Sequence, residues 1–184
     1  MSTRDTLATA CTAQALIDTP LGRMRLARTV RGLAGLWFEG QRHPPGDLPA
    51  PNDGDDPLLR EAALQLQRFF AGTLTHFDLP LDLFGTAFQR TVWQALLRIP
   101  AGRTCSYGEL ARDIGTPTAV RAVGGAVGRN PVSVVVPCHR VLGAGGALTG
   151  YAGGVERKQA LLVLDACAVA SADGVMPVPI GAIG

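Results

Sequence analysis

Two hydrophobic periodicities divide the chain into a strand-rich front and a helical remainder. Over residues 14–40 apolar and polar positions alternate around a turn at 19–22, and this pattern predicts β-strands, one of them over 32–38. After a loop at 43–57 that is rich in Pro, Gly and Asp, apolar residues recur at helical spacing until Gly72. The front of the chain is therefore predicted to be a small sheet-and-helix unit.

The second half of the chain contains the start and stop signals of several short helices. Thr86 is a candidate N-cap for a helix that ends at Pro100, and Ser106 with Glu109 fits a capping box that opens the next helix. A further helix is predicted over 119–127 after a tight turn. Such a pair is typical of a helix-turn-helix, although helix pairs without DNA-binding function show the same pattern.

The predicted helix over 119–127 is unusually rich in small residues. Gly124 and Gly125 each cost about 1 kcal/mol relative to alanine inside a helix. Small residues suit close packing against a neighbouring element, and they equally suit close approach to a ligand surface such as the DNA minor groove. The composition of this helix leaves both interpretations open.

The apolar, β-branched run 132–136 predicts a buried strand that ends at Pro137 and Cys138. A cysteine reacts as the thiolate, and a neighbouring His or Arg lowers the pKa of the thiol. On an extended chain, however, the side chains of Cys138 and His139 point to opposite faces, so a water or another residue would have to link them. A structural cysteine and a reactive one both fit these residues.

The distribution of charge changes the picture that the total gives. The chain has 184 residues, of which 47% are hydrophobic, and this composition excludes a largely disordered protein. Its net charge of +2, taken alone, argues against nucleic-acid binding. Residues 1–85 hold eight Arg and ten Asp or Glu, whereas 86–165 hold nine Lys or Arg and four Asp or Glu, a net charge of +5. A polyanionic partner and an ordinary solvated surface are both compatible with this basic half.

The cysteines and the hydropathy indicate a compartment but no metal site. Cys11, Cys105, Cys138 and Cys167 include no closely spaced pair of the kind that zinc sites use, so neither a metal nor another cofactor is expected. No apolar run reaches the roughly 18 residues that span a bilayer, and no signal peptide is readable. Free thiols in the cytoplasm, or at the nucleoid of a bacterium, are the expectation.

Six motifs in order resemble the O6-alkylguanine-DNA alkyltransferases, also called methylated-DNA–protein-cysteine methyltransferases. The segment PCHRV at 137–141 matches the active-site motif of this family, and the other five have its order and spacing: FQRTVW at 88–93, SYGELA at 106–111, RAVGGA at 121–126, NP at 130–131 and GYAGG at 150–154. The resemblance is strong over about residues 80–165 and looser before them.

The resemblance implies an α/β (α+β) architecture. A ribonuclease-H-like sheet-and-helix domain would occupy residues 1–83, a mostly helical, winged helix-turn-helix-like domain residues 84–168, and a flexible tail residues 169–184. The implied function is DNA repair by direct reversal, in which an alkyl group moves irreversibly, once per molecule, from O6-alkylguanine to Cys138. The resemblance extends the expected substrates, less directly, to O4-alkylthymine. The expected partner is duplex DNA that carries the lesion, with no membrane involved, and the protein is expected to be a monomer.

The resemblance also assigns the chemistry to particular residues. Cys138 matches the alkyl acceptor, and His139 matches the residue that takes the thiol proton through a water. Tyr107 matches the tyrosine whose hydroxyl bonds guanine N3, and Asn130 matches a residue that ties the recognition helix to the active-site loop. Where the family usually has a glutamate that polarises the histidine, this chain has Asp165, which is one methylene shorter.

DNA contacts are implied for the recognition helix. Arg121 matches the arginine finger that fills the stack after the target base is flipped out through the minor groove. Ala119, Ala122 and Gly125 would lie against the sugar-phosphate walls, and Arg129 would contact a phosphate. This assignment favours the DNA interpretation of the glycine-rich helix.

The wall of the base pocket is implied to come from the glycine-rich loop 143–154. Tyr151 and Gly153 would line the pocket, and backbone groups of Val141 and Ala152 would bind the edge of the base. Some family members have a serine where this chain has Ala152, so only the backbone contact carries over.

Two other functions share this fold. Alkyltransferase-like lesion sensors bind damaged DNA without repairing it, and they lack the acceptor cysteine, so Cys138 argues against a sensor. A helix-turn-helix regulator without chemistry is the other alternative, and the presence of Tyr107 and His139 argues against it.

Overall fold

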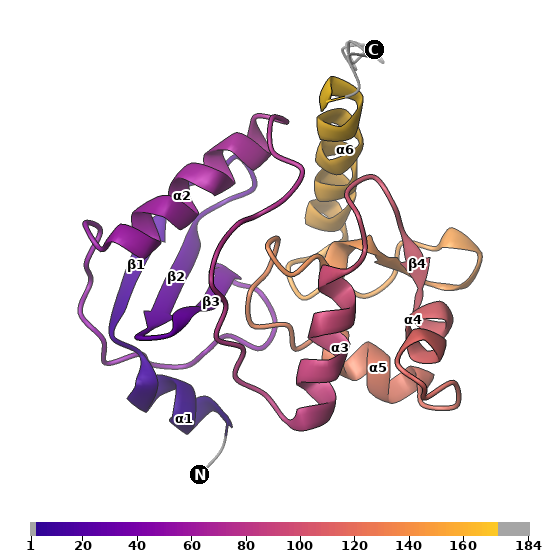
Figure 1. Cartoon of the computed structure of the whole chain (residues 1–184), viewed down its shortest axis with the longest axis horizontal. Coiled ribbons are helices and arrows are strands. Elements are labelled where there is room, and N and C mark those ends of the chain that lie inside the picture. Colours follow the sequence, from indigo (N-terminus) through magenta and orange to yellow (C-terminus); the bar gives the residue numbers. More distant parts are fainter. Residues whose placement is uncertain (1–2, 173–184) are drawn as a thin grey trace.

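The first three strands form one antiparallel sheet. In this computed structural model, which describes residues 3–172, β2 (Met24–Thr29) is the central strand between β1 (Ala13–Ile17) and β3 (Gly32–Phe38). Figure 1 shows α2 (Pro57–Phe70) lying across this sheet, with α1 (Thr3–Ala10) near the N-terminus. The predicted strand over 32–38 and the predicted helix of this unit are both confirmed.

Apolar residues on one face of α2 build the core beneath it. Leu59, Leu66 and Phe69 are fully buried and belong to the same cluster as Leu26 and Leu36 of the sheet. Burying each such side chain stabilises the fold by about 1.5–3 kcal/mol. The start of the helix is fixed by Asp56, whose carboxylate accepts hydrogen bonds from the first free N–H groups.

A smaller cluster covers the other side of the sheet. Leu7 of α1 packs with Ala34, Trp37 and Leu48, and Trp37 is nearly buried. The large indole fits because its neighbour on the strand is a glycine: a Cβ on Gly35 would lie 1.7 Å from the Trp37 ring. The glycine inside β3 therefore makes room for this tryptophan.

The rest of the chain is mostly helical, as expected. Within residues 84–172 it contains four helices: α3 (Ala87–Leu97), α4 (Tyr107–Asp113), α5 (Val120–Val127) and α6 (Val155–Ala172). The N-cap predicted at Thr86 and the capping box predicted at Ser106 are both present, and Gln89 completes a capping box at Thr86 as well. The neighbouring helices α4 and α5 form the predicted helix-turn-helix pair (Figure 1). A short parallel pair, β4 (Cys105–Ser106) with β5 (Val141–Leu142), and two 3-10 turns, η1 (Cys138–Arg140) and η2 (Ala144–Gly146), complete this half. The predicted α/β class, a small sheet domain followed by a helical domain, is confirmed.

The predicted strand over 132–136 is wrong. These residues are buried, but they form a compact turn in which Val136 N–H donates to Val132 O at 3.0 Å and Val134 has a φ of +72°. The cause is the preceding Asn130, whose Oδ1 accepts from Val132 N–H at 3.0 Å and whose Nδ2 donates to Val136 O at 2.8 Å. These side-chain bonds supply the partners that a sheet would otherwise provide, and they outweigh the strand propensity of valine.

The turn docks on the edge of the N-terminal sheet. Leu36 in β3 donates its N–H to Pro131 O at 2.9 Å and accepts from Ser133 N–H at 2.8 Å, which makes a short parallel bridge with Val132. A second link joins Arg157 of α6 to Leu21 O at 2.8 Å. The sheet therefore positions this turn and, through it, Cys138.

The last described helix is longer than the sequence indicated. The tail was predicted to begin at residue 169, but α6 continues to Ala172, so residues 169–172 are helical. The remainder of the predicted tail lies outside the described residues. No helix within residues 3–172 is long and apolar enough to cross a membrane.

Candidate active site

Cys138 is the first residue of η1 and is 4% exposed. Its Sγ accepts a hydrogen bond from Asn130 Nδ2 at 3.1 Å. Burial raises the pKa of the Cys138 thiol to about 11, and the bond from Asn130 and the charge of Lys158 oppose that rise only in part. The resting thiol is therefore protonated at neutral pH and needs a base to become a nucleophile.

His139 lies beside the thiol in the chain and is fully buried. Its Nε2 is 3.1 Å from Asp165 Oδ2, whereas its Nδ1 is buried without a hydrogen-bond partner in the described part of the chain. Burial lowers the pKa of His139, and the Asp165 carboxylate opposes this shift. A neutral imidazole that donates from Nε2 to the carboxylate has a free lone pair on Nδ1, which is the arrangement of a general base.

Arg140 is a site residue that sequence reasoning missed. Its guanidinium grips Asp165 with two bonds, from Nε to Oδ2 at 2.6 Å and from Nη2 to Oδ1 at 2.8 Å, and its Nη1 donates to Ile99 O at 2.7 Å. Burial alone would raise the pKa of the Asp165 carboxyl, but the hydrogen bonds from Arg140 and His139 hold it below its ordinary value. A buried carboxylate needs a cationic partner, and this requirement could have pointed to Arg140 from the sequence.

A second buried cation fixes the loop that follows η1 and β5. The Lys158 side chain is fully enclosed, and its Nζ donates to Val141 O at 2.6 Å and to Thr149 O at 2.8 Å. Burial lowers the pKa of this ammonium group, while the nearby Cys138 acts in the opposite direction. Lys158 therefore clamps both ends of the segment 142–148 and adds positive potential near the sulfur.

The expected pocket residues gather around this loop. Tyr107 is half-buried at the start of α4, and its hydroxyl donates to Gly150 O at 3.2 Å, while Tyr151 is buried. The pKa values of both phenols are raised by burial. Ala152 O accepts from a backbone N–H at 2.9 Å, and a Cβ on Gly153 would lie 2.7 Å from the Tyr151 ring.

The residues assigned to DNA lie on α5 and at its two ends, and Ala119 and Gly125 are half-buried. Ala119 is its N-cap, Ala122 and Arg121 are exposed, and Arg121 forms no hydrogen bond or ion pair with the residues that the structure describes. Arg129 follows the helix and donates from Nη1 to Gly125 O at 3.1 Å. This stretch of the chain therefore presents small side chains and one unengaged guanidinium to solvent.

These observations define a class: a two-domain α/β protein that carries a buried cysteine–histidine–aspartate cluster next to a helix-turn-helix pair. Two family models match the chain, the ribonuclease-like domain of 6-O-methylguanine DNA methyltransferase over residues 13–83 and the DNA-binding domain of the same family over residues 87–167. The chain belongs to the 6-O-methylguanine DNA methyltransferase family, as its motifs indicated.

Similar proteins agree in sequence and in fold. Proteins named methylated-DNA–protein-cysteine methyltransferase from Mycobacterium tuberculosis and Methanosarcina acetivorans are 51% and 45% identical to this chain, over 81% and 82% of it and 89% and 96% of their own lengths. The crystal structure of Mycobacterium tuberculosis OGT in complex with DNA is 48% identical, with a TM-score of 0.78 over 85% of this chain and 94% of that one.

The ionised carboxylate of Asp165 predicts how the free energy of unfolding changes at acid pH. Because the pKa of Asp165 is lower in the folded protein than in the unfolded chain, its stabilisation is complete above the unfolded pKa of about 3.9 and is lost as the pH falls through the folded value. We expect Asp165→Asn to have a free energy of unfolding about 3 kcal/mol lower than the wild type at pH 7. On acidification, the free energy of unfolding of this variant should fall by less than that of the wild type. Urea unfolding between pH 7 and pH 3 measures both effects.

Asp18→Asn is the matched control, since Asp18 forms an exposed ion pair with Arg23. It should follow the wild-type curve. An Asp165→Asn protein that also follows the wild-type curve would mean that this carboxylate does not hold a buried charge in the folded state.

Proposed function

We propose that this protein repairs O6-alkylguanine in duplex DNA by transferring the alkyl group to Cys138, once and irreversibly. The observation that carries the proposal is the buried imidazole of His139, the residue after Cys138. Its Nε2 is held by Asp165, and its Nδ1 has no partner among the described residues. Family membership supplies the substrate class, and relatives at about 50% identity carry the name of this activity.

The reaction follows from the order of these groups. One water passes the thiol proton of Cys138 to Nδ1 of His139, and the imidazolium is stabilised by Asp165, which Arg140 keeps ionised. The sulfur then attacks the alkyl carbon, the carbon–O6 bond breaks, and its electron pair goes to guanine. Guanine gains the proton that the thiol gave up, and the product is a thioether that nothing in the site reverses.

Asn130 and Tyr107 assist at the two ends of this reaction. The Nδ2–H group of Asn130 already points at the sulfur, and a hydrogen bond to a thiolate is stronger than one to a thiol, so it favours the charged nucleophile. The Tyr107 hydroxyl would exchange its bond to Gly150 O for guanine N3 and help the base to leave. The base would be enclosed by Val141, Tyr151, Ala152 and Gly153.

The protein reaches the lesion through the minor groove with α5. Ala119, Ala122 and Gly125 let the helix approach the sugar-phosphate walls, and Arg129 adds a phosphate contact. Arg121 enters the stack in place of the flipped nucleotide, which offsets part of the few kcal/mol that unstacking costs. The exposure of Arg121 and the absence of a partner for it among the described residues support this role.

The acceptor assignment predicts a covalent change at one residue. On incubation with a duplex that carries O6-methylguanine, we expect the intact mass to rise by one methyl-for-hydrogen exchange, located by peptide mapping at Cys138 and not at Cys11, Cys105 or Cys167. A duplex with O4-methylthymine should give the same product more slowly. Cys138→Ser should bind the lesion without changing mass.

An unchanged mass in a wild-type protein that remains bound to the lesion would refute the transfer and favour the lesion-sensor alternative. An unchanged mass with no preference for the lesion would favour the regulator.

The finger assignment predicts a difference between two substrates. Arg121→Ala should slow transfer from a duplex lesion by about tenfold or more, because the stack is no longer filled, but should change transfer from free O6-benzylguanine by less than about twofold. Single-turnover rates measure both, and Arg60→Ala on α2 is the control with the same loss of charge. Equal losses on both substrates would contradict the role.

A further inference from the structure

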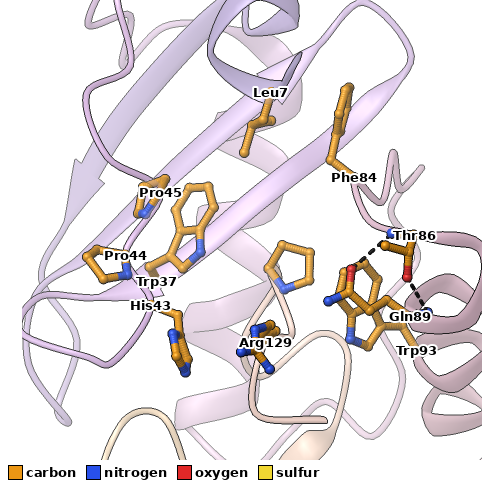
Figure 2. A pocket seen from close by; sticks show the side chains of 11 residues that line it. Leu7, Trp37, His43, Pro44, Pro45, Phe84, Thr86, Gln89, Trp93 and Arg129 are labelled. Atoms are coloured by element: carbon orange, nitrogen blue, oxygen red, sulfur yellow. Dashed lines mark hydrogen bonds between the residues drawn. The ribbon is translucent and has the colours of Figure 1, made fainter. Parts of the chain in front are cut away.

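A pocket outside the Cys138 cluster lies between the N-terminal sheet and the helical half, and of the residues assigned to DNA it includes Arg129 alone. Its volume is about 420 Å³, and it is lined by residues from α1, β3, the loop after β3 and α3, together with Arg129 and Pro131. Figure 2 shows the aromatic side chains of Trp37, Phe84 and Trp93 around it. None of the residues of the Cys138 cluster lines it.

One hydrogen-bond donor opens onto this space without a protein partner. Trp37 is 4% exposed, and its indole Nε1–H has no acceptor among the described residues. Figure 2 shows that nitrogen on the side of the ring that faces the pocket. The contrast is Trp93, whose Nε1 donates to Ala126 O at 2.9 Å. The Trp37 nitrogen is not itself fully buried, so water reaches it, and an acceptor on a ligand in the pocket would take the place of that water.

The charged side chain in the lining of the pocket is that of Arg129. His43 also lines the pocket, as Figure 2 shows, and no aspartate or glutamate does. Arg129 uses Nη1 for Gly125 O, and its other nitrogens have no hydrogen-bond partner within the described residues. His43 is exposed and has a φ of +58°, a conformation that costs energy in any residue other than glycine.

We propose that this pocket binds a small aromatic anion of up to mononucleotide size. Its ring would pack against the aromatic walls, and its carboxylate or phosphate would accept hydrogen bonds from Trp37 Nε1–H, Arg129 and His43. Aromatic walls combined with a few convergent donors and no acidic side chain are the composition of a site for such a ligand. This inference does not depend on the transfer reaction at Cys138.

The chain provides its own reporter for this site. Its sequence contains two tryptophans, and both line the pocket, so intrinsic tryptophan fluorescence reports on its occupancy. We would titrate the wild type with dAMP and with benzoate, each paired with its neutral counterpart, deoxyadenosine and benzyl alcohol. We expect a saturable change in tryptophan fluorescence with at least one anion, and about tenfold weaker binding of its neutral counterpart. The two anions distinguish a phosphate from a carboxylate ligand.

Two variants locate the binding. Trp37→Phe removes the donor but keeps an aromatic wall and leaves Trp93 as the reporter, so the affinity for the anion should fall about tenfold, the loss of one hydrogen bond to a charged group. His43→Ala should also weaken binding, whereas His76→Ala, which alters an exposed histidine outside the pocket, should not. Methyl transfer to Cys138 by Trp37→Phe at the wild-type rate would show that the variant is folded.

Three results would overturn the proposal. They are the absence of a saturable change with either anion, an equal response to the neutral counterparts, and an unchanged affinity in the folded Trp37→Phe protein. The last result would mean that the anion binds elsewhere on the basic half of the chain.

Discussion

The side-chain amide of Asn130 holds the turn on which the reactive thiol depends. It accepts from Val132 N–H, donates to Val136 O and donates to Cys138 Sγ, and it is itself buried. Hydrogen bonds of this kind matter more inside a protein than in water, since an amide that lost them would remain without partners. They also offset the cost of the positive φ at Val134, which is about 1–3 kcal/mol.

A second network of buried charges lies behind this turn and explains how a shorter carboxylate serves the site. Asp165 lacks one methylene relative to the glutamate usual in the family, yet its Oδ2 lies 3.1 Å from His139 Nε2. Arg140 fixes the carboxylate from the other side with two bonds and is itself anchored on Ile99 O. The carboxylate is thereby held against Nε2 of the histidine, and Nδ1 is left without a partner among the described residues.

Local signals in the sequence predicted local structure well. The N-cap at Thr86, the capping box at Ser106 and the strand over 32–38 depend on residues within a few positions of one another, and the structure has them as expected. The strand predicted over 132–136 failed because the bonds of Asn130 and the docking on Leu36 override the propensity of valine.

The candidate site was only partly accessible from sequence. The resemblance supplied Cys138 and His139, but it says nothing of the grip of Arg140 on a carboxylate 25 positions away or of the unpartnered N–H of Trp37. Both features arise from contacts between segments that the fold brings together. No spacing along the chain encodes them.

The account as a whole is tested most directly by the single-turnover rate of methyl transfer in Asn130→Asp. This variant keeps the acceptor for Val132 N–H but loses the donor to Val136 O and to the sulfur. We expect transfer to be slower by about ten- to a hundredfold, because a hydrogen bond to a charged group is lost. The affinity for the lesion duplex should stay within about threefold of the wild-type value. Transfer at the wild-type rate would show that the Asn130 amide does not prepare the thiol.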